Sequence, residues 1–212
     1  MHRQFPNMLT LMRLILAGAF FGVLNQYRYS APVPSWVLPL AIMIFITAAL
    51  TDMLDGHLAR RWKVESQFGR IMDPACDKVL VIGSFIYLMG GRFVIPQQTA
   101  SSEFFNMVSG VYPWMVVVIL ARELLVTGIR GKLEGMGIKF RAVWAGKLKM
   151  ILQSLAIPLV LLIVHLDPEL PSHGWMRLLR DVLVYLTVLV TAVSGIPYIL
   201  AAGRAMGKAP NG

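Results

Sequence analysis

Residues 29–51 read YSAPVPSWVLPLAIMIFITAALT, a run of 23 uncharged residues between Arg28 and Asp52. A helix that crosses the hydrocarbon core of a bilayer needs about 20 predominantly apolar residues. The run is long enough for this, and it predicts a transmembrane helix. Three further uncharged runs of similar length lie at 104–121, 150–166 and 182–203.

Two more apolar segments carry charges near one end. The segment at 7–27 contains Arg13, and the segment at 71–91 contains two aspartates and a lysine. Ionisable residues in a span are costly and mark functional positions. The first segment could instead be a secretory signal peptide, but no small-residue cleavage site follows it, and five more spans favour an anchor. The sequence therefore predicts six membrane helices.

The composition agrees with a chain embedded in a membrane. Of the 212 residues, 57% are hydrophobic and 15% are charged, and the mean hydropathy is +0.65. A soluble domain is roughly 45–50% apolar and about 25% charged, so a soluble globule is excluded. A single cysteine cannot form an internal disulfide. We expect one domain over residues 1–204 and a short disordered tail at 205–212.

The basic residues predict the orientation. With six crossings and both termini on one side, 16 of the 20 Lys and Arg residues fall on that side. Cytoplasmic loops carry the excess of Lys and Arg. The predicted fold is an all-α integral membrane protein with six transmembrane helices and both termini cytoplasmic. The net charge of +9 follows from this topology and from attraction to anionic headgroups, so it requires no nucleic-acid partner.

Four aspartates gather at one predicted cytoplasmic boundary. Asp52 and Asp55 are three residues apart, and Asp73 and Asp77 are four apart, so each pair shares one face of a helix. Four carboxylates held together need cations, and oxygen ligands favour Mg²⁺ or Mn²⁺. The pattern predicts a site for two metal ions. The alternative is a set of separate interfacial charges paired with nearby Arg and Lys side chains.

Small residues and an arginine accompany the aspartates. Gly56, Ala59 and Gly69 leave room for a ligand to approach the helix backbone. Arg60 supplies a guanidinium that can bind phosphate oxygens in a bidentate manner. Such a site suits a pyrophosphate group.

Written out, residues 52–77 read D-x2-D-G-x2-A-R-x8-G-x3-D-x3-D. In this pattern the chain resembles the CDP-alcohol phosphotransferase family, whose signature it matches at all eight fixed positions. The length and the six-helix plan also agree, so the resemblance covers nearly the whole chain. Further positions resemble the members that use glycerol phosphate: Asn7, Thr10, Arg13, Ala121, Arg122, Glu123, Arg130, Gly146, Lys147 and Lys149.

The resemblance implies an enzyme that transfers a phosphatidyl group from CDP-diacylglycerol to sn-glycerol 3-phosphate and releases CMP. Asp52, Asp55, Asp73 and Asp77 would hold two divalent metal ions, Mg²⁺ or Mn²⁺, and Asp77 would also act as the general base. Metal ions of this kind stabilise the charge that develops in phosphoryl transfer.

The resemblance also implies the substrate subsites. The CDP group would be lined by Asn7, Thr10, Gly56, Ala59, Arg60 and Gly69. The phosphate of the acceptor would be bound by Arg13, Arg122, Glu123, Arg130 and Lys147. A homodimer in the bacterial cytoplasmic membrane is implied, with the active site facing the cytoplasm.

Two alternatives stay open at this point. The positive-inside bias alone accounts for some of the basic residues, so the acceptor could be phosphatidylglycerol, as in cardiolipin synthases, or inositol phosphate. A divalent-cation transporter is an alternative of another class, because carboxylates in membrane helices often mark ion pathways. Interleaved arginines would repel a travelling cation but attract a diphosphate, and this favours the enzyme.

Overall fold

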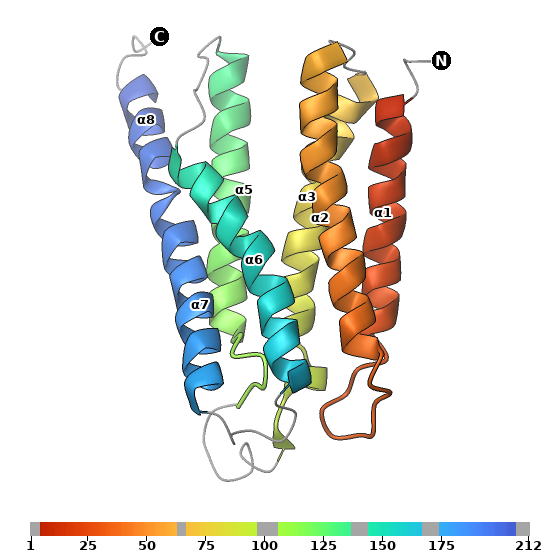
Figure 1. The fold of residues 1–212 in the computed structure, drawn as a ribbon. Coiled ribbons are helices and arrows are strands. Elements are labelled where there is room, and N and C mark those ends of the chain that lie inside the picture. Colours follow the sequence, from red (N-terminus) through yellow and green to blue (C-terminus); the bar gives the residue numbers. More distant parts are fainter. Residues whose placement is uncertain (1–4, 63–66, 97–105, 137–143, 167–173, 207–212) are drawn as a thin grey trace.

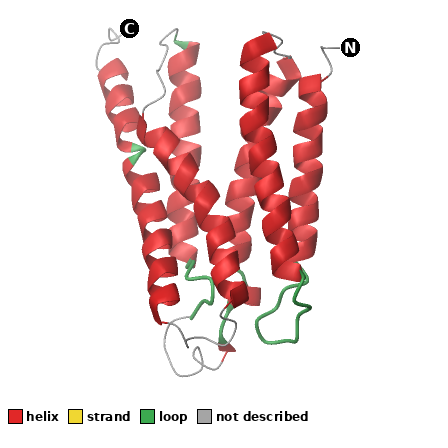
Figure 2. Ribbon diagram, in the orientation of Figure 1, coloured by secondary structure: helices red, strands yellow, loops and turns green. Residues whose placement is uncertain are grey.

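The computed structural model describes residues 5–62, 67–96, 106–136, 144–166 and 174–206. Apart from one isolated bridge between Val94 and Met107, these residues form no β-structure, and Figure 2 shows helices joined by loops. The all-helical prediction is confirmed. The elements are α1 (Phe5–Leu24), α2 (Val37–Trp62), α3 (Gln67–Leu88), η1 (Gly91–Phe93), α5 (Pro113–Gly135), α6 (Trp144–Leu166), α7 (Gly174–Val193) and α8 (Ile196–Met206).

The helices run up and down through one elongated bundle. Only Ser194 and Gly195 separate α7 from α8, so the described helices make six passes from end to end (Figure 1). We call the end at which α1 begins and α8 finishes the terminal end of the bundle. The 3-10 helix η1 lies at the opposite end.

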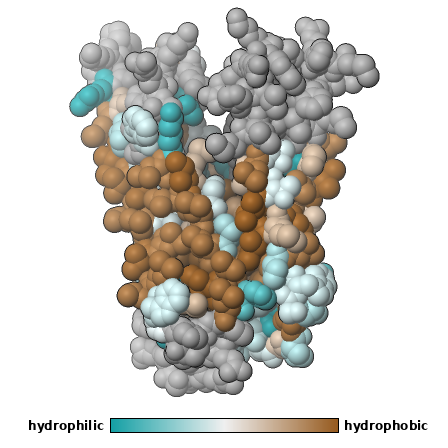
Figure 3. Space-filling model, viewed as in Figure 1, coloured by the Kyte–Doolittle hydropathy of each residue, from teal (hydrophilic) through white to brown (hydrophobic). Residues whose placement is uncertain are grey.

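The outer surface carries a broad apolar belt. Large side chains such as Ile15, Val117 and Leu189 are more than half exposed, and Figure 3 shows apolar residues covering the middle of the bundle. Within the described ranges, Gly146–Leu166 and Gly174–Arg204 are long and apolar enough to cross a membrane. Such a belt is typical of a surface that faces lipid and agrees with the membrane character read from the sequence.

Helix ends do not coincide with the ends of the uncharged runs. Within the run at 104–121, residues 106–112 lie outside any helix, whereas α5 starts at Pro113 and continues well past Arg122. Proline is favoured in the first helical turn because its missing N–H would have no partner there. Arg, Lys, Glu and Leu are good helix formers, so a charge ends an apolar run without ending the helix. Arg122, which follows the last residue of this uncharged run, therefore lies near the middle of α5.

Two groups of helices enclose the interior. Aromatic pairs hold α1 against α2 and α3: the tilted rings of Phe20 and Phe45 have centroids 5.6 Å apart, and the stacked rings of Phe21 and Tyr87 have centroids 5.0 Å apart. On the other side α5 contacts α7 and α8. Helix α6 contacts α2 and α3 as well as α7, and it crosses between the two groups (Figure 1).

A buried arginine fixes the loop before α5. Arg180 on α7 is 3% exposed and donates a hydrogen bond of 2.7 Å to the Val108 carbonyl. Its guanidinium also donates to Asp181 Oδ1 at 2.6 and 2.8 Å. Gly110, in the same loop, has a φ of 68°, a left-handed conformation that favours glycine.

Gly110→Ala is expected to lower the free energy of unfolding by about 2–4 kcal/mol. The new Cβ would lie 2.7 Å from Arg180 Nε and 2.8 Å from Asp181 Oδ1, in addition to the backbone strain. The measurement is thermal unfolding of the detergent-solubilised protein. Gly91→Ala is the matched control, because a Cβ there meets nothing within 4 Å. Equal unfolding midpoints for the two variants would contradict the role assigned to Gly110.

Candidate active site

A cavity of about 510 Å³ lies between the two groups of helices. Its described lining comes from α1, α2 and α3 on one side and from α5, α6 and α8 on the other. Six basic residues contribute to this lining: Arg13, Lys78, Arg122, Arg130, Lys147 and Lys149. Among the described lining residues, Glu123 is the one acidic residue. We call the surface formed by these six basic residues the basic wall, and its strong positive charge favours an anion.

A buried ion cluster joins α5 to α6 at this wall. Arg122 Nη1 donates a hydrogen bond of 3.0 Å to Glu123 Oε1, and Lys149 Nζ donates to the same oxygen. All three side chains are 9% exposed. A buried charge is tolerated only when it is paired and hydrogen-bonded, so Glu123 holds both cations in place.

The break between α7 and α8 gives Arg122 a further partner. Pro197 has no N–H and cannot continue the hydrogen-bond ladder of α7, which ends at Val193. The Ser194 carbonyl then accepts a hydrogen bond of 3.4 Å from Arg122 Nη2. A Cβ on Gly195 would lie 3.4 Å from Arg122 Cγ, so a glycine there lets the arginine pass closely.

The third nitrogen of this guanidinium, Nε, makes no hydrogen bond within the described part of the chain. Arg122 Nε is buried, so it is closed off from the cavity, and an unpaired buried N–H costs free energy. What Arg122 offers an anion in the cavity is therefore the positive charge of its guanidinium.

Lys78 connects the aspartate-bearing helix to the basic wall. It follows Asp77 on α3, and its Nζ donates a hydrogen bond of 2.5 Å to Thr127 Oγ1 on α5. Thr127 in turn donates to the Glu123 carbonyl at 2.7 Å. From the sequence, Lys78 is one of the basic residues that interleave with the aspartates and would attract a diphosphate, and it is not assigned to the acceptor subsite. Its position directly after Asp77 was the available signal for a role in the site.

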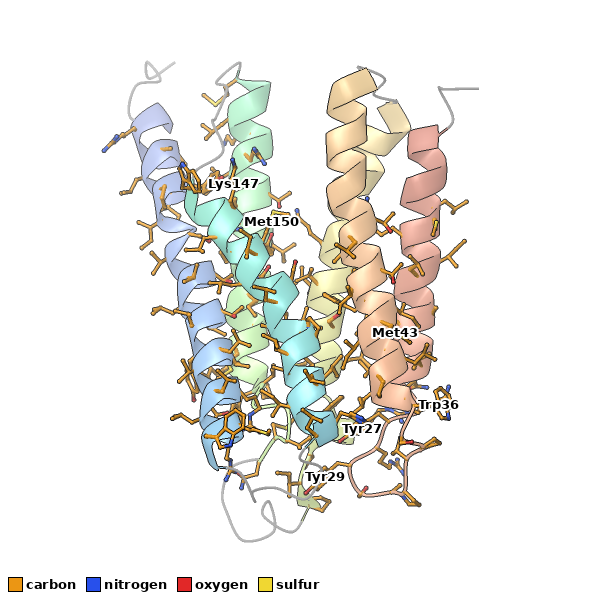
Figure 4. The ribbon with its side chains drawn as sticks, viewed as in Figure 1. Tyr27, Tyr29, Trp36, Met43, Lys147 and Met150 are labelled. Atoms are coloured by element: carbon orange, nitrogen blue, oxygen red, sulfur yellow. The ribbon has the colours of Figure 1, made fainter. Side chains whose placement is uncertain are left out.

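All five residues expected around the acceptor phosphate line the cavity. Arg13 comes from α1, Arg122, Glu123 and Arg130 come from α5, and Lys147 comes from the upper part of α6 in Figure 4. Lys149 lines the same cavity, although the expected acceptor set did not include it. Gln153, Ser154 and Tyr198 were also missed, because neutral polar residues in apolar helices carry no pattern that separates lining from core.

The aspartates can be placed only by their helices. Asp52 and Asp55 lie in α2, whereas Asp73 and Asp77 lie in α3, in the helical parts near the terminal end (Figure 1). Their side chains, and those of Asn7, Thr10, Gly56, Ala59, Arg60 and Gly69, fall outside the described residues. No cluster of three metal-binding side chains occurs among the side chains that are described. A set of four carboxylates nevertheless fits a hard divalent ion by its chemistry.

Lys149→Met is expected to lower the free energy of unfolding by about 2–4 kcal/mol, because a buried carboxylate loses one of two partners. Combining it with Glu123→Gln is expected to cost about 1–2 kcal/mol less than the sum of the single changes, since the double variant leaves no unpaired carboxylate. Unfolding of the four proteins in detergent measures this coupling. Additivity within about 0.5 kcal/mol would contradict the ion pair.

An all-helical, apolar chain whose interior holds an anion-attracting cavity beside an aspartate-rich pair of helices belongs to the class of membrane enzymes that act on phosphate groups. The profile of the CDP-alcohol phosphatidyltransferase family matches residues 3–193, and the chain belongs to this family. The family resemblance drawn from the aspartate motif is thereby confirmed, as is the prediction of a phosphatidyltransferase enzyme.

Curated relatives are similar along most of their length. The chain is 31% identical to the "Probable phosphatidylglycerophosphate synthase" of Mycobacterium tuberculosis, over 95% of this chain and 82% of the relative. It is 32% identical to the "CDP-diacylglycerol--glycerol-3-phosphate 3-phosphatidyltransferase" of Bacillus subtilis, over 91% of this chain and 92% of the relative. A protein of the same name from Haemophilus influenzae is 28% identical over 93% of this chain and 92% of its own length.

Proposed function

We propose that this protein transfers the phosphatidyl group of CDP-diacylglycerol to sn-glycerol 3-phosphate, giving phosphatidylglycerophosphate and CMP. The observation that carries the proposal is the cavity with six basic lining residues, next to the helices that bear the family motif. The names of the Mycobacterium tuberculosis and Bacillus subtilis relatives support the same donor and acceptor.

The basic wall favours a compact phosphorylated acceptor. A phosphomonoester brings close to two negative charges, which the guanidinium and ammonium groups of the cavity can bind by charge-assisted hydrogen bonds. A neutral or zwitterionic alcohol would gain less from the positive charge of this lining, because it brings no net negative charge. Six cations would also repel a travelling divalent ion, so the cavity opposes the transporter alternative.

The transfer step assigns roles to residues on both sides of the cavity. The basic wall holds the acceptor phosphate, and Asp77 accepts the proton of the attacking hydroxyl. The hydroxyl oxygen forms a bond to the phosphorus of the phosphatidyl group. The bond from that phosphorus to the bridging oxygen of the diphosphate breaks, and CMP leaves with the electron pair.

Metal and nucleotide sites complete the proposal. Asp52, Asp55, Asp73 and Asp77 hold two divalent ions, Mg²⁺ or Mn²⁺, which when bound stabilise charge on the phosphate oxygens. Arg60 binds the diphosphate. The rest of the CDP subsite is lined by Asn7, Thr10, Gly56, Ala59 and Gly69.

The proposed topology places this site at the cytoplasmic face. The six passes cross a bacterial cytoplasmic membrane, with the terminal end and both termini in the cytoplasm, as the positive-inside rule predicts. Residues 1–204 form the catalytic domain and residues 205–212 a tail, although α8 continues through residues 205 and 206, and the protein is a homodimer. CDP-diacylglycerol enters with its acyl chains in the bilayer, and the soluble acceptor enters from the cytoplasm.

CMP release by the purified protein tests the function. CDP-diacylglycerol is supplied with Mg²⁺ or Mn²⁺, and glycerol 3-phosphate, inositol phosphate, serine and phosphatidylglycerol are compared as acceptors. The expected result is turnover that depends on glycerol 3-phosphate and stops when a chelator is added. Turnover with another acceptor alone would discard the glycerol-phosphate assignment, and no CMP from any acceptor in folded protein would discard the transferase.

A further inference from the structure

Glu123 offers the cavity a carboxylate oxygen that no described residue uses. Both of its cationic partners, Arg122 and Lys149, donate to Oε1. Oε2 accepts no hydrogen bond within the described part of the chain, and it is not among the occluded atoms there. Glu123 itself lines the cavity, so of its two oxygens Oε2 is the one left to meet a ligand there.

An ionised carboxylate accepts hydrogen bonds and donates none. A phosphate group beside Oε2 would be repelled, because both groups are negative. The same oxygen suits a hydroxyl group, which donates a proton to it. Glu123 is also held by two cations, so its position is set before the substrate arrives and little ordering is needed on binding.

The geometry points to Glu123 as the residue that selects the acceptor by its non-reacting hydroxyl group, through a hydrogen bond from that hydroxyl to Oε2. This inference rests on the proposed function, in which glycerol 3-phosphate is the acceptor. That molecule carries a phosphate and two hydroxyl groups. The cations bind the phosphate, and the reacting hydroxyl attacks the phosphorus of CDP-diacylglycerol. The second hydroxyl is therefore the group that can donate a hydrogen bond to Oε2.

The arrangement along α5 agrees with this division. Arg130 lies seven residues beyond Glu123 on α5, about 10 Å further along the helix axis and nearer the terminal end. Thr127, one turn beyond Glu123, accepts a hydrogen bond from Lys78 on the aspartate-bearing helix. A short acceptor can therefore reach towards Arg130 with its phosphate while its carbon chain passes Glu123 and the reacting end faces α3.

The test compares two acceptors that differ by one hydroxyl group. Glycerol 3-phosphate and 3-hydroxypropyl phosphate are supplied to the purified full-length protein with CDP-diacylglycerol, and kcat/KM is measured for each. Loss of a hydrogen bond to a charged group is expected to lower kcat/KM for the analogue by about 10- to 100-fold in the wild-type protein.

Glu123→Gln is expected to bring the kcat/KM values for glycerol 3-phosphate and 3-hydroxypropyl phosphate to within about threefold of each other. The amide turns its carbonyl oxygen towards Arg122 and Lys149, which are donors, so its NH₂ group replaces Oε2 and the hydroxyl loses its charged acceptor, keeping at most a weaker neutral hydrogen bond. Glu123→Asp keeps the charge but withdraws the carboxylate by one methylene, and the same small ratio is expected. Lys147→Gln is the control: it weakens phosphate binding, so kcat/KM falls for both acceptors and their ratio stays within about twofold of wild type.

The outcomes separate this inference from the proposed function. No turnover of glycerol 3-phosphate by the wild-type protein would overturn the function itself. Turnover with equal kcat/KM for the two acceptors would leave the function standing and overturn the role of Glu123, without any variant being needed. An unchanged ratio in Glu123→Gln or Glu123→Asp would also overturn it, because another group would then bind the hydroxyl.

Discussion

Asp73→Asn is expected to reduce CMP release by at least about 1000-fold while the protein still folds. Asparagine has nearly the same size as aspartate, but its amide oxygen is neutral and binds a divalent ion weakly. Weaker metal binding removes the stabilisation of negative charge that phosphoryl transfer requires, so turnover falls. The measurement is CMP release at saturating CDP-diacylglycerol and glycerol 3-phosphate, with the thermal unfolding midpoint recorded on the same preparation.

Asp181→Asn is the matched control for Asp73→Asn. Asp181 lies in the first half of α7, pairs with the arginine that holds the loop before α5, and is absent from the cavity lining. This variant is expected to keep turnover within about twofold of wild type, since only a contact to Arg180 changes. Near-normal turnover in folded Asp73→Asn protein would refute the proposed metal site.

The second large effect is expected from Arg122→Ala, which should lower kcat/KM for glycerol 3-phosphate by about 100-fold. The guanidinium lines the cavity, and Glu123 and the Ser194 carbonyl hold it in place, so its positive charge is fixed where an oxyanion would bind. Glu123 keeps Lys149 as a partner in this variant, and the ion cluster is only partly lost. The KM for CDP-diacylglycerol should stay within about threefold.

Arg204→Ala is the control for Arg122→Ala. Arg204 also lies on a helix that reaches the terminal end, but it is exposed and outside the cavity. Its removal takes away the same charge without a buried contact, so kcat/KM for the acceptor should stay within about twofold. If Arg122→Ala changed only the KM of the nucleotide donor, Arg122 would belong to the other subsite.

The motif from Asp52 to Asp77 was readable because its information is local. Each aspartate pair is three or four residues apart, a spacing that places both members on one helix face before any tertiary contact forms. The basic acceptor residues were harder to predict. Arg122 and Lys149 also satisfy the positive-inside bias, and linear spacing cannot tell a topogenic charge from one that lines a cavity.

The sequence alone determined that the chain is helical and apolar, and it determined the family, because hydropathy and a spaced motif are properties of the chain order. It also indicated six passes, which depend only on the lengths of apolar runs. The tertiary structure decided where the helices end, with α5 running well past Arg122. It also decided which charges meet: Glu123 pairs with Lys149 from 26 residues away, and Lys78 with Thr127 from 49. Such contacts depend on the packing of helices distant in the chain, which no local spacing encodes.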